Sequence, residues 1–122
     1  MDVRMKRAYD AAAPTDGYRS LIDRLWPRGV SRERAKLDAW DKELAPSVEL
    51  RRWFAHDPGR FEEFRRRYID ELRGQRPRLA ALRRQAREGT LTLVYSAHDT
   101  EHNDAVVLAE VLRRGLPRPP MV

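Results

Sequence analysis

The sequence predicts a single small α/β domain with three layers, in which helices flank a short and largely parallel sheet, as in Rossmann-like folds. Three observations support this fold class. Two short strand patterns lie near the N-terminus, a series of helical patterns follows, and a nearly all-apolar strand pattern at residues 90–97 precedes a final apolar helix. Because strands and helices alternate in this way, we expect about three to four strands and about five helices within residues 1–122.

The two N-terminal strands are predicted at residues 3–8 and 18–23. The first alternates apolar with basic residues, which is typical of a strand with one face in water. The second contains the pair Leu21-Ile22, which suits a buried position. Pro14 and the turn-forming pair Asp16-Gly17 predict a loop over residues 9–17 between the two strands.

The centre of the chain predicts helices from N-cap residues and apolar spacing. Ser31 is a favourable N-cap and a narrow apolar stripe follows it, so helical character is expected at residues 32–44. Pro46 ends that segment. Three further helices are expected at residues 47–56, 57–73 and 77–89, and their N-termini are marked by Ser47, by Asp57-Pro58 and by Pro77.

The strand at residues 90–97 is the clearest in the sequence, because its apolar run fits a strand that is buried on both faces. A last helix is expected at residues 101–114, with apolar residues around much of its circumference and Gly115 at its C-terminal end. Residues 116–122 contain three prolines and are expected to form an irregular tail.

The composition favours a soluble protein of the reducing cytoplasm. The chain has no cysteine, which excludes disulfides, thiolate ligands and a thiol nucleophile. No apolar run follows the charged N-terminus and none is long enough to span a bilayer, so neither a secretory signal nor a membrane segment is expected. The net charge of +6 taken alone suggests nucleic acid, but only three of the 25 basic residues are lysines and acidic residues are interspersed among them.

Two polar clusters follow the second and third predicted strands. The first is the corner at residues 23–29, with the sequence Asp-Arg-Leu-Trp-Pro-Arg-Gly, and the second spans residues 96–103. Ligands of parallel sheets bind outside the carboxyl ends of the strands. If these two strands are neighbours, the clusters face each other and form a site.

The corner predicts an anion site. Arg24 and Arg28 are expected to hold the anion, because two guanidinium groups exceed what one carboxylate needs, and Asp23 is the candidate for proton transfer. Trp26 either stacks on a planar ligand or packs as an anchor in the core. The structural alternative for the three charged residues is an internal salt bridge that holds the corner against a helix.

The second cluster supplies the remaining candidates. His102, near a helix N-terminus, is expected to be neutral and able to act as a base, and Asn103 to orient the ligand. The further ligand-binding candidates are Ser96 and Asp99, and the secondary candidates are Arg19, His56 and His98. In the structural alternative, Asp99 or Thr100 caps the helix and the rest is solvated.

Metal binding and nucleic-acid binding are weaker hypotheses. His98 and His102 are four residues apart, which on one helix would suit a metal ion, but His98 is expected to precede the helix and no third ligand is placed nearby. We therefore predict no metal and no other cofactor. The run Arg65-Arg66-Arg67 is interpreted as a solvated helix face and only secondarily as a contact for a phosphate backbone.

Four groups of residues, in the same order along the chain, resemble a bacterial family. They are Gly17-Tyr18-Arg19 with the corner; Trp40 with Leu44-Ala45-Pro46-Ser47; Leu50-Arg51 with Trp53-Phe54 and His56-Asp57-Pro58; and Leu93-Val94-Tyr95-Ser96-Ala97 through Asp99 and Glu101-His102-Asn103 to Ala105-Val106-Val107-Leu108.

On these residues the chain resembles the YeaO-like proteins, domain-of-unknown-function family 488, over nearly its whole length. The resemblance implies a compact α/β fold and a bacterial origin, and no established activity. Where many members carry lysine this chain has His98, so no cationic role carries over to that position. A thiol mechanism of related proteins does not transfer either, because this chain has no cysteine.

The function that these patterns favour is the binding of an anionic small molecule, either phosphorylated or carboxylated. Whether the protein also performs acid–base chemistry on this molecule at the strand ends is left open. Two alternatives remain at this point. One is a nucleic-acid-associated module, and the other is an accessory protein that binds a partner without chemistry. The sequence leaves open whether the protein is an enzyme, and it leaves the oligomeric state open as well.

Overall fold

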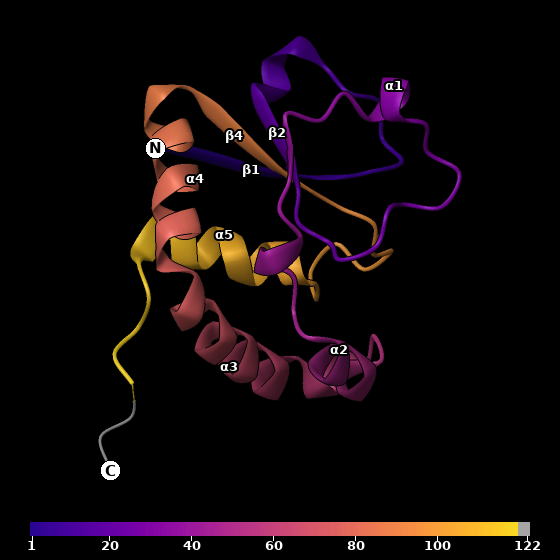
Figure 1. Ribbon diagram of the computed structural model, residues 1–122. Helices are drawn as coiled ribbons and strands as arrows, with labels where there is room; N and C mark the ends of the chain where they lie inside the picture. The colour runs from indigo at the N-terminus through magenta and orange to yellow at the C-terminus, as the bar shows by residue number, and fades with distance from the viewer. Residues whose placement is uncertain (120–122) are drawn as a thin grey trace.

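Four parallel strands form the centre of the protein in the computed structural model, which describes residues 1–119 (Figure 1). They are β1 (Asp2–Arg7), β2 (Tyr18–Leu21), β3 (Ala39–Trp40) and β4 (Thr90–Tyr95), and they lie in the order β1-β4-β2-β3. Strand β4 pairs with β1 on one side and with β2 on the other. The predicted α/β class with a short parallel sheet is therefore confirmed.

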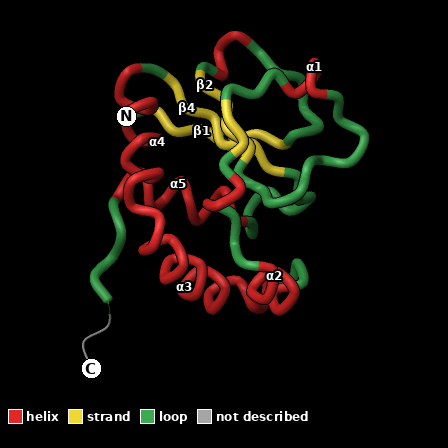
Figure 2. Tube along the Cα trace, in the orientation of Figure 1, coloured by secondary structure: helices red, strands yellow, loops and turns green. Residues whose placement is uncertain are grey.

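Four of the five α-helices lie on one side of this sheet: α2 (Val48–Phe54), α3 (Phe61–Leu72), α4 (Arg76–Glu88) and α5 (Asp104–Arg114). The fifth is the short α1 (Arg32–Ala35). Helices α4 and α5 pack on the sheet, and α3 lies beyond α5 with α2 beside it (Figures 1 and 2). The opposite face is covered by irregular chain around α1, so the sheet is the middle of three layers.

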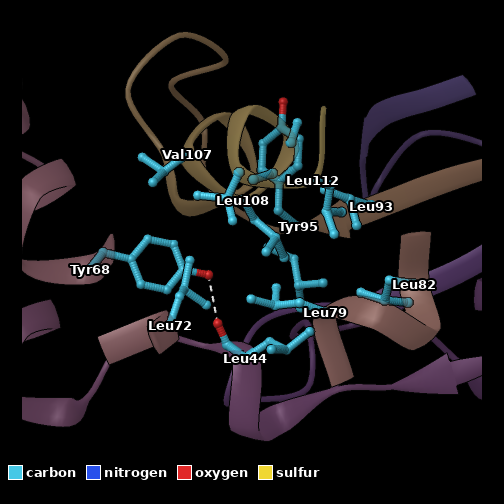
Figure 3. Packing of buried hydrophobic residues seen from close by; sticks show 14 of the residues in the cluster. Leu44, Tyr68, Leu72, Leu79, Leu82, Leu93, Tyr95, Val107, Leu108 and Leu112 are labelled. Atoms are coloured by element: carbon cyan, nitrogen blue, oxygen red, sulfur yellow. Dashed lines mark hydrogen bonds between the residues drawn. The ribbon is translucent and has the colours of Figure 1, made fainter. Parts of the chain in front are cut away.

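The core follows from the alternation of side chains along β4. Leu93 and Tyr95 point into the larger apolar cluster together with residues of α3, α4 and α5 (Figure 3). Val94 points the other way, into a small cluster with Ala8 and Leu21. Because every residue from Leu91 to Tyr95 is buried, the strand is apolar on both faces, as its sequence predicted.

The prediction of a helix at residues 32–44 is wrong beyond its first turn. Helix α1 ends at Lys36, which adopts a left-handed conformation with φ 45°. The next residues form β3 because they bond to β2 rather than to one another: the Asp38 carboxylate accepts the Arg19 N–H at 2.8 Å, and the Asp41 N–H donates to the Leu21 carbonyl at 2.8 Å. The Asp41 side chain also binds Ser20 and Arg78.

The last helix begins three residues later than predicted. The Asp99 carboxylate accepts the backbone N–H groups of Glu101 and His102 at 2.9 and 3.0 Å, which holds residues 99–102 in a turn. Asn103 is the N-cap of α5, because its Oδ1 accepts the Val106 N–H at 3.0 Å. Neither Asp99 nor Thr100 therefore caps this helix.

Ser31 and Ser47 cap α1 and α2 as predicted, because they accept the N–H groups of Arg34 and Leu50. Asp57 accepts the Gly59 N–H and caps a short 3-10 turn at Pro58–Arg60, so α3 itself begins later than predicted, at Phe61. Helix α4 begins at Arg76, one residue before the predicted start at Pro77. Residues 116–119 form no helix or strand, and the rest of the predicted tail, residues 120–122, lies outside the described residues. None of the helices within residues 1–119 has the length and apolar character that a membrane crossing requires.

Candidate functional site

The two predicted polar clusters meet at the carboxyl ends of β2 and β4. Because these strands are neighbours, with Leu21 opposite Val94, the residues that follow them lie side by side. The Asp23 Oδ2 atom accepts hydrogen bonds from both the N–H and the hydroxyl of Ser96, at 2.8 and 2.5 Å. Asp23 is therefore held in place by the strand next to its own.

A cavity of about 660 Å³ opens at this edge of the sheet. It is bounded by the chain after β2, the chain after β4, and residues of α2, α3 and α5. Ten of the eleven predicted site residues line it: Asp23, Arg24, Trp26, Arg28, His56, Ser96, His98, Asp99, His102 and Asn103. The structure thus brings both predicted clusters to one cavity.

Arg19 is the predicted residue that lies elsewhere. Its side chain is buried, and its guanidinium donates to the Asp16 carboxylate at 2.7 Å and to the Ala35 carbonyl at 3.0 Å. Burial opposes ionisation of Asp16, but the Ala13 N–H and then the cations Lys6 and Arg19 outweigh it and lower the Asp16 pKa. Arg19 is therefore placed as a structural ion-pair residue.

Arg24 has a buried polar atom whose hydrogen bonding is incomplete. Its Nη2 atom has one long contact to the Pro46 carbonyl, at 3.5 Å. Its Nε atom is buried and has no hydrogen-bond partner among residues 1–119. A buried donor without a partner costs about 1–3 kcal/mol, so the Nε–H of Arg24 is an unsatisfied donor in the cavity wall.

Two carboxyl groups lie together in the wall of the cavity. Asp104, the first residue of α5, is half-buried beside Asp23. Burial, and then the negative charge of Asp23, raise the pKa of Asp104 well above its ordinary value. Asp104 therefore keeps its proton at pH values where an isolated aspartate has lost it.

The lining also contains residues that the sequence did not single out as functional. Phe54 and Phe64 stack with ring centroids 4.3 Å apart, and both were interpreted from their helical spacing as core. Arg51, Tyr9 and Leu25 are exposed residues of the lining. Asp104 was not predicted as a site residue because an acidic residue in the first turn of a helix is ordinarily explained by its favourable interaction with the helix dipole. Its position directly after Asn103, a predicted site residue, was the sequence feature that could have indicated it.

Several predicted ligand residues also have internal partners. The Asn103 Nδ2 atom donates to the Asp99 carbonyl at 2.8 Å in addition to the cap described above. The Trp26 Nε1–H donates to the Val30 carbonyl at 2.6 Å, and its ring lies edge-on to Trp40 with centroids 5.3 Å apart. Both arrangements favour positioning roles, and direct contact with a ligand stays a prediction.

His102 is placed by Asp99 and by an aromatic ring. Its Nδ1 atom is 2.9 Å from the Asp99 Oδ2 atom, and its ring lies edge-on to Phe61 with centroids 5.2 Å apart. The N–H of Glu101, followed by His102, lowers the pKa of Asp99. The Asp99 carboxylate therefore fixes the imidazole orientation, and a role for His102 in proton transfer stays a prediction.

The arginine run on α3 pairs with acidic residues. Arg65 binds Glu110 at 2.6 Å, and Arg66 and Arg67 both bind Glu63, at 2.5 and 2.7 Å. These two guanidinium groups lower the Glu63 pKa to about 2. Each arginine of this run pairs with a carboxylate, although three arginines share two glutamates, so the run is partly neutralised and nucleic-acid binding stays a prediction.

Comparison with known proteins places the chain in a family. A family profile described as "Inactive DUF488-N3 subclade" matches residues 2–119. The chain is 45% identical to the uncharacterised protein YeaO of Escherichia coli (strain K12) over 93% of this chain and 98% of that protein. It is 40% identical to the uncharacterised protein Rv3073c of Mycobacterium tuberculosis (strain H37Rv) over 90% of this chain and 92% of that protein. No solved structure matches the chain. The protein therefore belongs to the DUF488 family, as its resemblance to the YeaO-like proteins predicted.

Proposed function

We propose that the cavity at the carboxyl ends of β2 and β4 binds an anionic small molecule that also carries an apolar group. The observation that carries this proposal is the buried Nε–H of Arg24, which lacks a hydrogen-bond acceptor among the described residues of the cavity wall. A carboxylate or a phosphate fits a guanidinium fork and satisfies this donor with a charge-assisted hydrogen bond.

The charges around the cavity favour an anion. Its lining contains the three arginines Arg24, Arg28 and Arg51 and the three aspartates Asp23, Asp99 and Asp104. These charges would cancel if all six groups were ionised. Burial and the charge of Asp23 raise the Asp104 pKa, so at any pH where Asp104 keeps its proton the balance of these six groups is positive and favours an anion.

The size and lining of the cavity favour a ligand with an apolar body. A volume of about 660 Å³ lies within the range of small-molecule sites. The exposed side chains of Tyr9 and Leu25, with half-buried Trp26, offer an apolar surface for such a body, whereas Phe54 and Phe64 are buried in the core behind the lining. A bare inorganic anion would leave this surface in contact with water, so an organic carboxylate or phosphate fits better than sulfate or inorganic phosphate.

We propose binding without turnover as the function of this site. The matching subclade is described as inactive, and that description favours binding over catalysis. The hydrogen bonds at Asp23 agree with it, because Ser96 occupies one carboxylate oxygen with two donors. In this proposal Asp23 and His102 orient the ligand rather than transfer protons.

The experiment that tests the proposal compares charged and neutral probes of one shape. Benzoate, phenyl phosphate and neutral benzamide are titrated into the ¹⁵N-labelled protein, and the amide shifts of residues 23–28 and 96–104 are followed by NMR. We expect both anions to shift these amides and benzamide to bind at least about tenfold more weakly, because one charge-assisted hydrogen bond contributes about 1.5–3 kcal/mol.

A matched pair of variants locates the anion. Arg24→Gln should weaken benzoate binding about tenfold or more, whereas Arg84→Gln, the same change on the exposed side of α4 outside the cavity, should leave it unchanged. Circular dichroism of both variants checks the fold. Equal binding of benzoate and benzamide, or equal losses in the two variants, would overturn the proposal.

A further inference from the structure

The exposed part of the cavity lining carries basic side chains and no acidic one. The exposed lining residues, which we call the rim, are Tyr9, Leu25, Arg28, Arg51, His56 and His98. The carboxylates of the lining, Asp23, Asp99 and Asp104, are all half-buried and belong to the interior. The lining is therefore sorted by charge, with the cationic and N–H-donating side chains outermost.

The basic side chains of the rim are not paired with carboxylates. None of the ion pairs within residues 1–119 involves a residue of the rim. Asp10 and Asp57 follow rim residues in the sequence but lie outside the lining, and Asp57 pairs with Arg60 at 3.6 Å. An anionic group at the rim therefore meets cations without a competing carboxylate in the described lining.

Two of the rim residues follow Arg24 along α2. The Arg24 Nη2 atom contacts the Pro46 carbonyl, at 3.5 Å, just before this helix. The carbonyl of the next residue, Ser47, accepts the Arg51 N–H at 2.9 Å, so Arg51 lies one turn further on. His56 follows the last turn of the helix. Since one turn advances about 5.4 Å, the interior cation and these two rim residues are spaced by about one to two turns.

His56 is held on the rim by an unusual backbone turn. The Asp57 N–H donates to the Phe54 carbonyl at 3.0 Å and closes this turn. The two residues inside it, Ala55 and His56, have φ angles of 49° and 55°. Turns with two positive φ angles are formed mainly by glycine, asparagine and aspartate, and glycine adopts such angles at the lowest cost. A side chain kept at such a position points to a function, and His56 lines the cavity whereas Ala55 does not.

We propose, on the basis of the anion-binding function above, that Arg51 and His56 form a second anion subsite beside Arg24, so that the ligand is a small molecule with two anionic groups joined by an apolar segment. One anionic group pairs with the Arg24 guanidinium. The other pairs with the Arg51 guanidinium and accepts an N–H from His56. The exposed side chains of Tyr9 and Leu25 give the apolar segment a surface outside the core.

Probes that differ by one charge test the second anionic group. The α,ω-dicarboxylates from glutarate to suberate are compared by NMR titration with their monomethyl esters, which lack one of the two charges. We expect the diacid of fitting length to bind at least about fivefold more tightly than its monoester, of which about twofold is the statistical advantage of two equivalent ends. This preference should decrease with added salt, because salt screens exposed charges.

Two matched pairs of variants locate the second group. Arg51→Gln should lower the ratio of diacid to monoester affinity, whereas Arg52→Gln, the same change at the next exposed residue of α2, outside the lining, should keep the wild-type ratio. His56→Gly should also lower the ratio. Ala55→Gly, which relieves the same turn outside the lining, should not. Circular dichroism of the four variants checks the fold.

The chemistry of the two groups is tested on the diacid that binds most tightly. Its ω-phosphono analogue carries a phosphonate in place of one carboxylate. Tighter binding of the phosphono compound assigns a phosphorylated carboxylate to the site, and tighter binding of the diacid assigns a dicarboxylate.

The outcomes distinguish this inference from the proposed function. If benzoate and the monoesters bind equally to wild type and Arg24→Gln, the anion site itself is refuted. If they lose affinity in Arg24→Gln but no diacid exceeds its monoester by more than about twofold, the anion site stands and the second subsite is overturned. Equal ratios in Arg51→Gln and Arg52→Gln, or in His56→Gly and Ala55→Gly, also overturn it, because the preference then reflects general attraction to a positively charged protein.

Discussion

Replacing Asp104 by asparagine is expected to remove one component of the pH dependence of stability. Asparagine keeps the size of the side chain and cannot ionise. In the native protein, burial and the charge of Asp23 raise the Asp104 pKa above the ordinary value of 3.8. The unfolded chain has lost this proton above that value, while the folded protein still holds it.

The sign and size of the effect follow from this difference in bound protons. Because the native state binds more protons than the unfolded state, the free energy of unfolding falls as the pH rises from about 4 toward the raised pKa. One carboxyl group contributes a slope of up to about 1.4 kcal/mol per pH unit. Asp16 and Glu63, whose pKa values are lowered, contribute in the opposite direction and at lower pH.

The assay is urea unfolding of wild type and Asp104→Asn at closely spaced pH values from about 4 upward. The difference between the two free energies cancels the titrating groups that do not interact with position 104 and isolates Asp104 together with its interaction with Asp23. Glu62→Gln, the same carboxyl-to-amide change at an exposed position of α3, is the matched control and should follow the wild-type curve. If the free energies of unfolding of wild type and Asp104→Asn change in parallel with pH throughout, the Asp104 pKa is not raised by burial and by Asp23.

Other substitutions test the interactions that hold the scaffold. Asp16→Asn removes the charge that pairs with the buried Arg19 guanidinium, so denaturant unfolding should show a loss of about 3–5 kcal/mol near neutral pH, and the wild-type advantage should disappear as the pH falls through the lowered Asp16 pKa. Gly17→Ala should cost at least about 2 kcal/mol, because φ is +64° and a Cβ atom would lie 2.3 Å from the Thr90 carbonyl oxygen. Gly29→Ala, at φ +81° in open space, should cost only about 1 kcal/mol in the same assay.

The sheet could be predicted where local sequence decides the structure. Strand β4 is apolar at nearly every position because both its faces are buried, and such a run is visible without any tertiary information. The caps Ser31 and Ser47 act on backbone groups three residues away, so they too could be identified from the sequence. Strand β3 could not, because its two residues are held by contacts from elsewhere. Trp40 donates its Nε1–H to the Asp23 carbonyl at 2.7 Å, and this bond depends on the complete fold.

In the candidate site, too, some features could be predicted from the sequence, whereas others depend on the complete fold. Asp23 and Ser96 could be placed at one edge because parallel strands end on the same side of a sheet, and their contact is observed. Asp104 and the aromatic rings reach the cavity from helices, and helix packing on the strand ends could not be deduced from periodicity. Phe54 and Phe64 lie on apolar helix faces as core residues do, and only the folded chain shows that they also border a cavity. The roles predicted for the individual residues remain to be measured.

A crystal structure of the protein grown with benzoate, with sulfate as the competing anion, tests the central claim most directly. The account predicts an ordered carboxylate within hydrogen-bond distance of the Arg24 guanidinium, with the phenyl ring against the exposed apolar lining at Tyr9 and Leu25. It is contradicted if Arg24 instead pairs with a carboxylate of the protein itself and the space between the ends of β2 and β4 contains only water or the protein's own side chains.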